Sequence, residues 1–360
     1  MSSIPVVHSL EDARRSRFVD KVLEDMSGTT MTMLAVIGDR LGLFKDLEAR
    51  GPATSADFAE RAGIKERYAR EWLSAMANSG YLDYDPRRSV FSMPEAHGAV
   101  LAHENGPQFL GGVYQMLPAL IGQLDAVTRS FQDGGGVSPS EYDDGIWNGM
   151  ERFTNVWFEN MLVQEWIAAM PEVGAKLERG ALVADVGCGR GRAIIKLAQS
   201  FPNSRYVGYD VHGPSIQRAN QNAATAGVAD RVRFEVRDAA EGLPARYDVI
   251  TTFGALHDAA NPRGIVGAIR RAMRPNGRYV CVEVPCADKL EENTGPLGEL
   301  FHGYSVLYCM TASLARGGEA LGALGVTEPK VRELCFEAGF GDVRRLPLQN
   351  PFNVVYEIKP

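Results

Sequence analysis

A glycine-rich segment, Asp185-Val186-Gly187-Cys188-Gly189-Arg190-Gly191, follows a short apolar run and precedes a helical pattern. Glycine lets the main chain approach a ligand closely, and a helix N-terminus offers free N–H groups. The spacing Gly-x-Gly-x-Gly differs from the Gly-x-Gly-x-x-Gly of dinucleotide-binding turns, although a nicotinamide site or a plain tight turn remains open. The carboxylate of Asp185 would repel a pyrophosphate and attract an ammonium group. The segment therefore favours a ligand with a positive end and no phosphates.

Two further acidic residues end later apolar runs. Asp210 closes Val207-Gly208-Tyr209-Asp210, at the distance from the glycines where a carboxylate accepts hydrogen bonds from ribose hydroxyls. Asp238 follows the next run and could accept a proton from the exocyclic amino group of adenine, although Asp at a strand end is also a common loop starter. Ribose, adenine and a cationic amino-acid end without phosphate describe S-adenosylmethionine.

The elements that must position these residues alternate between short apolar runs and helical patterns. After residue 180 the runs are 182–186, 206–209, 232–236, 247–251 and 278–282, and the helical patterns are 192–200, 214–226 and 262–273. Such alternation predicts a parallel sheet covered by helices on both faces. At the end of the chain, a helix at 328–338 precedes runs 343–347 and 353–358, whose short connection allows only antiparallel pairing.

The N-terminal third follows a different pattern. Apolar residues spaced along 29–43 predict a buried helix face, Thr54-Ser55-Ala56-Asp57 predicts a capping box, and 65–79 predicts a second amphipathic helix that ends at Gly80. Runs 81–84 and 89–91 alternate like a hairpin, which completes a winged-helix arrangement. Residues 1–100 carry 13 Lys and Arg against 15 Asp and Glu, so packing and dimerisation are favoured over DNA binding.

The middle of the chain is predicted to be helical over 107–131 and 141–170, with a linker at 132–139 where glycines and Pro139 stop a helix near Phe131. Most of its aromatic residues, Trp147 and Trp166 among them, are expected in the core. The predicted organisation is 1–105 as a mostly α winged-helix domain, 106–174 as helical linker and pocket roof, and 175–360 as an α/β domain.

The motifs together resemble the class I S-adenosylmethionine-dependent methyltransferases, in the two-domain small-molecule branch whose winged-helix domain serves dimerisation. The resemblance rests on the glycine-rich segment, the Tyr209-Asp210 tip, Asp238-Ala239, Thr252-Phe253-Gly254-Ala255-Leu256-His257-Asp258 and Arg274-Pro275-Asn276-Gly277. It implies a Rossmann-like seven-stranded sheet with a terminal antiparallel pair. It also implies S-adenosylmethionine as cofactor and S-adenosylhomocysteine as product, held by Asp185, Gly187, Gly189, Gly191, Asp210, Val211, Asp238, Ala239, Phe253 and Gly254.

The same resemblance implies a catalytic role for His257, the general base of a His-Asp pair, and for Glu283, a carboxylate beside that histidine. An imidazole with a pKa near neutrality can take the proton of an attacking hydroxyl or thiol. A histidine that only packs against the cofactor or caps a helix fits the position as well. Ala259-Ala260-Asn261-Pro262 replaces the Trp and acidic residue usual in the plant-type pattern, so a phenolic acceptor is not implied.

An acceptor pocket is expected beneath the insertion 285–327 and the helices of 107–170. Aromatic and polar side chains in these segments are the candidate pocket residues: Tyr114, Trp157, His302, Tyr304, Tyr308 and Met310. The glycine-rich stretch 315–325 could act as a lid or as an ordinary loop.

Composition narrows the compartment and the partners. The 360 residues are 45% hydrophobic and 23% charged with a net charge of −7, which favours a soluble protein and disfavours nucleic acid and anionic lipid. Neither a membrane span nor a secretory signal can be read, and the five cysteines lack a Cys-x-x-Cys pair, so we expect a cytoplasmic protein with reduced thiols. The histidines lack metal-ligand spacing, so no metal site is expected.

The leading hypothesis is a methyltransferase for a small-molecule acceptor, whose reacting atom (O, N, S or C) the sequence leaves open, acting as a homodimer through its N-terminal domain. One alternative is a methyltransferase-like enzyme that binds the cofactor and catalyses a non-methylating reaction. Another is a winged-helix DNA-binding regulator that senses the cofactor.

Overall fold

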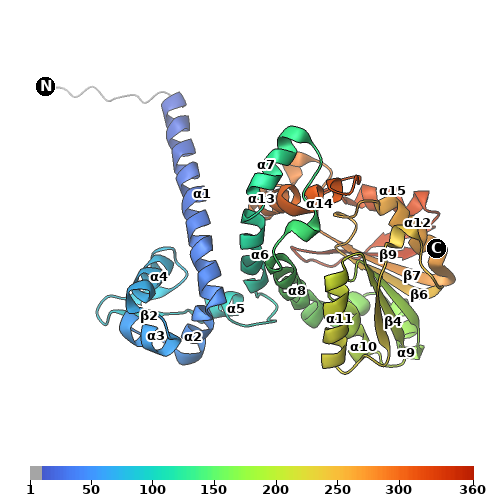
Figure 1. Ribbon diagram of the computed structural model, residues 1–360, viewed down its shortest axis with the longest axis horizontal. Helices are drawn as coiled ribbons and strands as arrows, with labels where there is room; N and C mark the ends of the chain where they lie inside the picture. Colours follow the sequence, from blue (N-terminus) through green and yellow to red (C-terminus); the bar gives the residue numbers. More distant parts are fainter. Residues whose placement is uncertain (1–9) are drawn as a thin grey trace. The chain divides into compact units, whose positions relative to one another are not determined.

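The computed structural model describes residues 10–360 and divides the chain into two compact units, one ending at Gln115 and the other running from Met116 to Pro360 (Figure 1). Buried hydrophobic residues form a separate core in the first unit and two cores in the second. The question of a secretory signal falls on residues 1–9, outside the described residues. Among the described helices, none has the length and apolar character needed to cross a bilayer. The division into 1–105, 106–174 and 175–360 stays a prediction.

The first unit is the winged helix that the sequence predicts. Its elements are α1 (Leu10–Arg40), α2 (Leu43–Arg50), α3 (Ser55–Ala62), α4 (Glu66–Asn78), β1 (Asp83–Asp85), β2 (Val90–Ser92) and α5 (Glu95–Leu101). The side chain of Thr54 accepts from the N–H of Asp57 and caps α3, as the capping box predicts. Trp72 and Leu73 of α4 are buried with Phe44 and Phe58, so α4 packs its apolar stripe against α2 and α3.

Helix α1 is much longer than predicted, because it begins at Leu10 and not near Thr29. Near the predicted start, two threonine hydroxyls donate to carbonyls one turn earlier, Thr29 to Asp25 at 2.8 Å and Thr32 to Gly28 at 2.7 Å. Such back-bonding satisfies the hydroxyls inside a continuous helix. Gly42, with φ of 67°, separates α1 from α2.

The predicted helices of the middle segment are shorter than expected. Residues 107–131 form α6 (Gly111–Ile121) and α7 (Leu124–Asp133), with a break at Gly122. Residues 141–170 form α8 (Gly145–Trp157), which continues as the π-helix η2 (Phe158–Ile167), after a short 3₁₀ turn η1 (Pro139–Glu141). The predicted stop near Phe131 is present, because α7 ends at Asp133, and within 132–139 Val137 is buried, with its N–H donating to Thr311 Oγ1 at 2.9 Å.

The second unit is built on a seven-stranded sheet in the order β5-β4-β3-β6-β7-β9-β8, which confirms the predicted Rossmann-like fold. Its strands are β3 (Leu182–Val186), β4 (Arg205–Asp210), β5 (Val232–Val236), β6 (Tyr247–Phe253), β7 (Met273–Glu283), β8 (Asp342–Arg345) and β9 (Val354–Lys359). Pairing is parallel from β5 to β7, and β9 lies antiparallel between β7 and β8, which confirms the predicted terminal pair.

Helices cover both faces of this sheet. One face packs against α9 (Pro171–Arg179), α10 (Arg192–Ser200) and α11 (Gly213–Thr225), and the other against α12 (Pro262–Ala272) and α15 (Glu328–Glu337). Shorter segments complete the unit: η3 (Ala239–Glu241), η4 (Leu290–Glu292), α13 (Gly295–Tyr304), η5 (Ser305–Cys309) and α14 (Met310–Leu314). The central strand β3 lies between β4 and β6. The chain passes from β3 to β4 and β5 on one side and then crosses to β6 on the other side of β3. A crevice at the carboxyl ends of the strands is the expected ligand site of such a sheet.

Candidate active site

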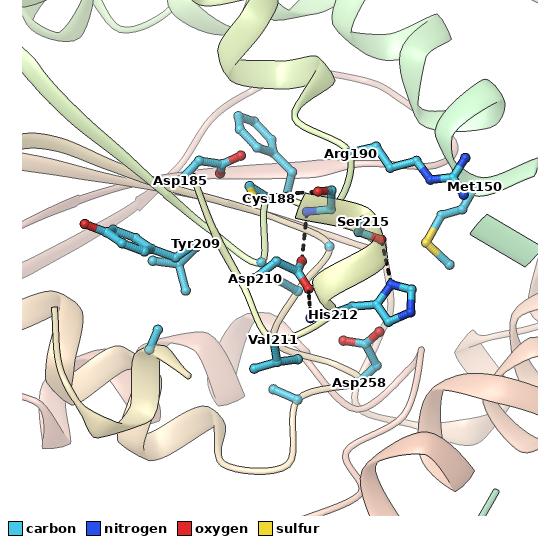
Figure 2. A pocket seen from close by; sticks show the side chains of 18 of the residues that line it. Met150, Asp185, Cys188, Arg190, Tyr209, Asp210, Val211, His212, Ser215 and Asp258 are labelled. Carbon is cyan, nitrogen blue, oxygen red and sulfur yellow. Dashed lines mark hydrogen bonds between the residues drawn. The ribbon is translucent and has the colours of Figure 1, made fainter. Parts of the chain in front are cut away.

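A cavity lies at the carboxyl edge of the sheet, where the ends of β3, β4 and β6 meet helix α8 (Figure 2). Nine of the ten residues implied to hold the cofactor line it, namely Asp185, Gly187, Gly189, Asp210, Val211, Asp238, Ala239, Phe253 and Gly254. Gly191 instead packs behind the loop, where an added Cβ would strike the ring of Phe234. Residues from four separate strand ends therefore converge on one cavity.

The glycine-rich loop needs its glycines for conformation and for space. Gly187 has φ of 72°, and a Cβ there would lie 2.5 Å from the Cβ of Ala255. Gly189 has φ of 51°, and a Cβ there would meet no atom within 4 Å. These are left-handed conformations that L side chains rarely adopt. The loop is therefore a close-fitting backbone cradle on its Ala255 side and open on the other.

Asp210 fixes the shape of that loop. One of its carboxylate oxygens accepts from the N–H of Gly189 and the other from the N–H of His212, both at 2.8 Å. Burial raises the pKa of Asp210 above its ordinary value, and the two N–H bonds oppose that rise. Carboxylate oxygens accept up to about four hydrogen bonds in total, so Asp210 can take ligand hydroxyls as well.

Asp185 is 1% exposed, and its Oδ1 accepts from Thr251 Oγ1 at 2.7 Å. Burial raises the pKa of Asp185 to about 7, and the nearby Asp210 carboxylate adds to this rise, whereas the Thr251 bond opposes it. A cation bound in the cavity would stabilise the charged form of both carboxylates. The donor set therefore fits a ligand with positive charge, as the sequence indicates.

Asp238 lines the cavity and also starts a loop. Its side chain caps η3 by accepting from the N–H of Ala240 at 2.9 Å. The loop-starting role considered in the sequence is therefore present, and it holds Asp238 and Ala239 in place at the cavity wall.

Several cavity residues were missed by sequence reasoning. Helix α8 contributes Trp147, Met150, Glu151 and Thr154, and the remaining missed side chains include Arg190, His212, Asp258 and Arg316. Trp147 was assigned to the core, but its ring stacks on His212 with centroids 4.3 Å apart. Asp258 alone carried a signal, since it adjoins His257 in the sequence. The α8 residues lack one, because their helical spacing is equally that of a packing face.

His257 and Glu283 form a buried pair beside the cavity. His257 Nδ1 lies 2.7 Å from Glu283 Oε2, and Glu283 Oε1 accepts from the N–H of Leu256 at 2.9 Å. Burial lowers the pKa of His257, but the charges and hydrogen bonds of Glu283 and Cys309 together outweigh it and raise that pKa well above the ordinary value. Neither side chain lines the cavity itself, whereas their neighbours Gly254, Ala255 and Asp258 do.

Burial also raises the pKa of Asp258 to about 6, with His257 opposing and the carboxylates of Glu283 and Asp210 adding to the rise. Asp258, Asp185 and Asp210 line one cavity with two further carboxylates, those of Asp238 and Glu151. Within residues 10–360 no group of His, Cys, Asp or Glu side chains is arranged to hold a metal ion.

The structure separates the six predicted acceptor residues. Tyr308 lines the cavity, and its ring meets that of Trp147 edge-on at 6.1 Å. Trp157 packs against Phe153 and Phe352, and Tyr114 belongs to the first unit, where its hydroxyl bonds that of Tyr81 at 3.2 Å. His302, Tyr304 and Met310 lie in α13 and α14 and do not line the cavity. These acceptor assignments stay predictions.

The fold and the site define a class: a doubly wound sheet with a Gly-x-Gly-x-Gly cradle, acidic strand ends and a cavity suited to a cationic nucleoside is the architecture of a class I methyltransferase. Residues 177–307 match a family model described as a methyltransferase domain, and residues 29–103 match one described as an Rv2258c-like winged HTH domain. The chain therefore carries a methyltransferase domain that follows a winged-helix domain, and its cavity fits the S-adenosylmethionine that the sequence predicts as cofactor.

Known proteins resemble the chain over different lengths. A 27-O-demethylrifamycin SV methyltransferase of Amycolatopsis mediterranei is 29% identical over 185 residues, covering 46% of this chain and 67% of the relative. An 8-amino-8-demethylriboflavin N,N-dimethyltransferase of Streptomyces davaonensis is 25% identical over 272 residues, covering 71% and 74%. The structure of human N-acetylserotonin methyltransferase in complex with SAM has the same fold, with TM-score 0.69 and 17% identity over 99% of both chains.

The close fit of the glycine-rich loop can be tested by adding a methyl group at Gly187. Gly187→Ala should weaken binding of S-adenosylhomocysteine at least tenfold, because the new methyl meets Ala255 and the left-handed conformation costs about 1–2 kcal/mol. Adding Ala255→Gly removes the contact and should restore part of the affinity, measured by titration calorimetry. Gly189→Ala is the control for conformation without a clash. A double variant no better than Gly187→Ala would contradict the close-fit explanation.

Proposed function

We propose that the chain transfers the methyl group of S-adenosylmethionine to a hydroxyl oxygen of a small molecule, with His257 as general base. The observation that carries this proposal is the buried His257–Glu283 pair, 2.7 Å apart at the carboxyl ends of β6 and β7. A histidine with a carboxylate on Nδ1 is oriented so that its other nitrogen can take a proton. A hydroxyl acceptor has such a proton to lose, whereas a thioether sulfur does not.

In this proposal, different residues contact different parts of the cofactor. Asp185 attracts the ammonium of the amino-acid end, Asp210 takes the ribose hydroxyls, and Asp238 with Ala239 meets the adenine. When bound, S-adenosylmethionine supplies an electrophilic methyl carbon on a positively charged sulfur. The chain then contributes by holding the acceptor in line with that carbon and by excluding water from the cavity.

The proton follows a defined route in this proposal. The acceptor hydroxyl gives its proton to Nε2 of His257 as its oxygen bonds to carbon, and the ring becomes an imidazolium. Glu283 stabilises that imidazolium through the Nδ1 hydrogen bond and is itself held by the N–H of Leu256. The thiol of Cys309 in η5 hydrogen-bonds the same ring, and its neighbour Tyr308 lines the cavity.

Oxygen is favoured over nitrogen on two grounds. A hydroxyl needs its proton removed as it attacks, which gives the His257–Glu283 pair a task, whereas a neutral amine attacks through its own lone pair. The rifamycin relative also bears the name of an O-methyltransferase, although the riboflavin relative is named for nitrogen. Screening hydroxylated and amino small molecules with isotopically labelled cofactor tests the proposal. Cofactor consumption without methylated product would point to the non-methylating alternative.

His257→Ala should lower kcat by about 10²–10⁴, the usual contribution of a general base, while leaving the affinity for S-adenosylhomocysteine within twofold. The measurement is turnover at saturating cofactor beside titration calorimetry with the product. His103→Ala, an exposed histidine of the first unit, is the control for loss of an imidazole. Turnover near the wild-type rate would rule out proton removal by His257.

The pH profile should report the His257–Glu283 pair. Only the neutral ring can accept a proton, so turnover should fall as pH drops through the raised pKa of His257. Glu283→Gln removes the charge that raises this pKa and leaves burial, which lowers it. The acid limb of kcat/KM should therefore move to lower pH by about one unit or more, with a lower plateau. A limb that stays in place would contradict the pairing.

We also propose that the chain forms a homodimer through α1. Apolar side chains of this helix are 39–92% exposed, namely Leu10, Phe18, Val19, Val22, Leu23, Met26, Met33 and Ile37. At 100° per residue, those from Phe18 to Ile37 share one face, which a second copy of α1 would cover. On the neighbouring α4, Arg67 and Arg70 pair with Glu71 and Glu66, so its cations are neutralised, which disfavours DNA as the partner.

Five free cysteines suit a reducing compartment such as the cytoplasm.

Charges placed on that face should separate the copies. Phe18→Glu with Met26→Glu puts carboxylates where apolar surface would be buried, so light scattering after size exclusion should show the mass fall from dimer to monomer. Arg17→Glu changes charge on the opposite face of α1 and should leave the dimer intact. A wild-type chain that elutes as a monomer at micromolar concentration would contradict the proposal.

A further inference from the structure

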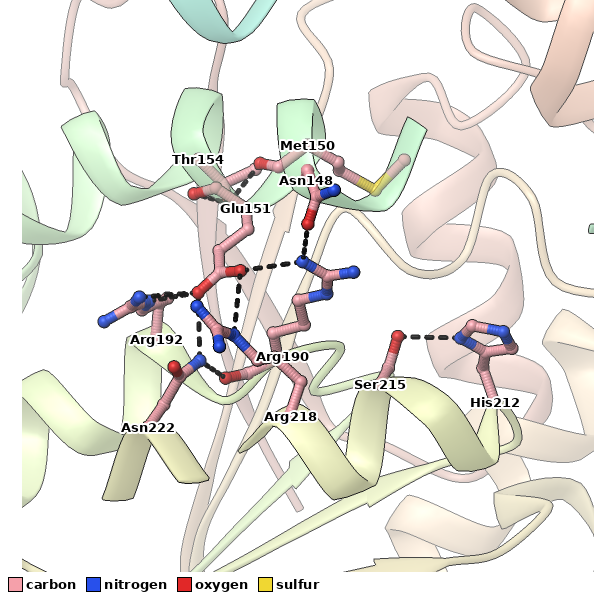
Figure 3. Close-up of polar contacts among 10 residues, drawn as sticks. All are labelled: Asn148, Met150, Glu151, Thr154, Arg190, Arg192, His212, Ser215, Arg218 and Asn222. Carbon is pink, nitrogen blue, oxygen red and sulfur yellow. Dashed lines mark hydrogen bonds and ion pairs between the residues drawn. The ribbon is translucent and has the colours of Figure 1, made fainter. Parts of the chain in front are cut away.

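One buried carboxylate joins the cavity wall to the cofactor cradle. Glu151 lies on α8, its side chain is 9% exposed, and it lines the cavity with its helix neighbours Trp147, Met150 and Thr154. Its partners come from the elements that hold the cofactor, and none of them belongs to α8 (Figure 3). A side chain in this position can fix the distance between wall and cradle.

The contacts reach three separate elements. Arg190, in the glycine-rich loop, approaches Glu151 Oε2 at 3.0 Å, and Arg192, at the start of α10, approaches Oε1 at 2.6 Å. Asn222 of α11 donates to the same Oε1 at 2.9 Å and to the carbonyl of Arg190, also at 2.9 Å. Asn148, one turn before Glu151, accepts from Arg190 at 2.5 Å. Arg190, between Gly189 and Gly191, is thus bonded to Asn148 and Glu151 of α8 and to Asn222 of α11.

The charges make this cluster depend on Glu151. Three guanidinium groups, those of Arg190, Arg192 and the more distant Arg218 at 3.9 Å, face a single carboxylate. Burial opposes the charge of Glu151, but its hydrogen bonds to Arg190 and Arg192 lower its pKa, so the carboxylate stays charged at neutral pH. Without that charge, the guanidinium groups would repel one another and the loop would lose its fastening to α8.

We propose that Glu151 is a positioning residue that holds the glycine-rich loop against α8 and thereby sets the affinity and residence time of the cofactor. It touches neither the methyl group nor the acceptor in this role. The inference rests on the proposed function for its ligand, because the loop that Glu151 fastens is the one whose Gly189 N–H orients Asp210. Second contacts of this kind fix the groups that bind a ligand directly.

The position of α8 gives the fastening a second consequence. Trp147 of the same helix stacks on His212, whose ring bonds Ser215 Oγ at 2.8 Å at the start of α11. Helix α8 therefore meets the cradle at two points, the Glu151 cluster and the Trp147–His212 stack. Loosening the stronger of the two should let α8 lift and release a bound ligand sooner.

The test compares two buried carboxylates with the same chemistry. Glu151→Gln should raise the Kd of S-adenosylhomocysteine at least tenfold by titration calorimetry and raise its dissociation rate in stopped-flow displacement. Glu357→Gln is the matched control, because Glu357 is 4% exposed between Arg278 and Arg344 on β9, away from the cavity. The control should lose a comparable amount of thermal stability while its Kd stays within twofold. An equal rise in Kd for both variants would overturn the proposal.

A milder variant covers the case in which Glu151→Gln does not fold. Arg192→Gln keeps the Glu151–Arg190 pair and removes the link to α10, so its Kd should rise about threefold or more. A Kd within twofold of wild type for any folded variant of this cluster would overturn the positioning role. Failure of the wild-type chain to bind S-adenosylhomocysteine would instead overturn the proposed function. In folded Glu151→Gln, the loss of affinity should also appear as a higher KM for the cofactor.

Discussion

The hydrogen bonds that Asp210 accepts from Gly189 and His212 are the constraint on which the site depends. They join the tip of β4 to the loop after β3, so two neighbouring strands present one continuous surface. The loop can take its left-handed turns only because glycine stands there, and the carboxylate holds those turns in one arrangement. The position of Asp185, Val211 and the cavity floor follows from that link.

The same link has an electrostatic cost that a ligand offsets. Asp185, Asp210 and Asp258 lie at one cavity, and burial raises the pKa of each. A sulfonium and an ammonium bound in this cavity would stabilise the charged forms of these carboxylates, in addition to the guanidinium group of Arg316. On the α8 side the balance reverses, since guanidinium groups outnumber the carboxylate of Glu151.

The parts of the site that could be predicted are the motifs formed by residues close together in the sequence. The glycine spacing, Asp210 at a strand end and the His257–Asp258 pair depend on local order along the chain. The parallel sheet followed from the alternation of runs and helices, and the antiparallel pair from the short connection at the end of the chain. The Glu151 cluster could not be found, because its ion pairs join residues about forty positions apart and each member looks like an ordinary surface charge. Likewise, the exposed first half of α1 lacked a buried stripe to mark it as helix.

Two carboxylates, Glu283 and Glu151, show how the number and kind of partners set a role. Glu283 faces one ionisable ring, and its charge raises the pKa of that ring, which is why the pair is proposed to move a proton. Glu151 faces guanidinium groups, which do not release protons at any working pH. Its charge is therefore constant, and it can act only by fixing distances. The neighbouring helix and strand ends thus separate proton movement from positioning, because a histidine stands opposite one carboxylate and arginines opposite the other.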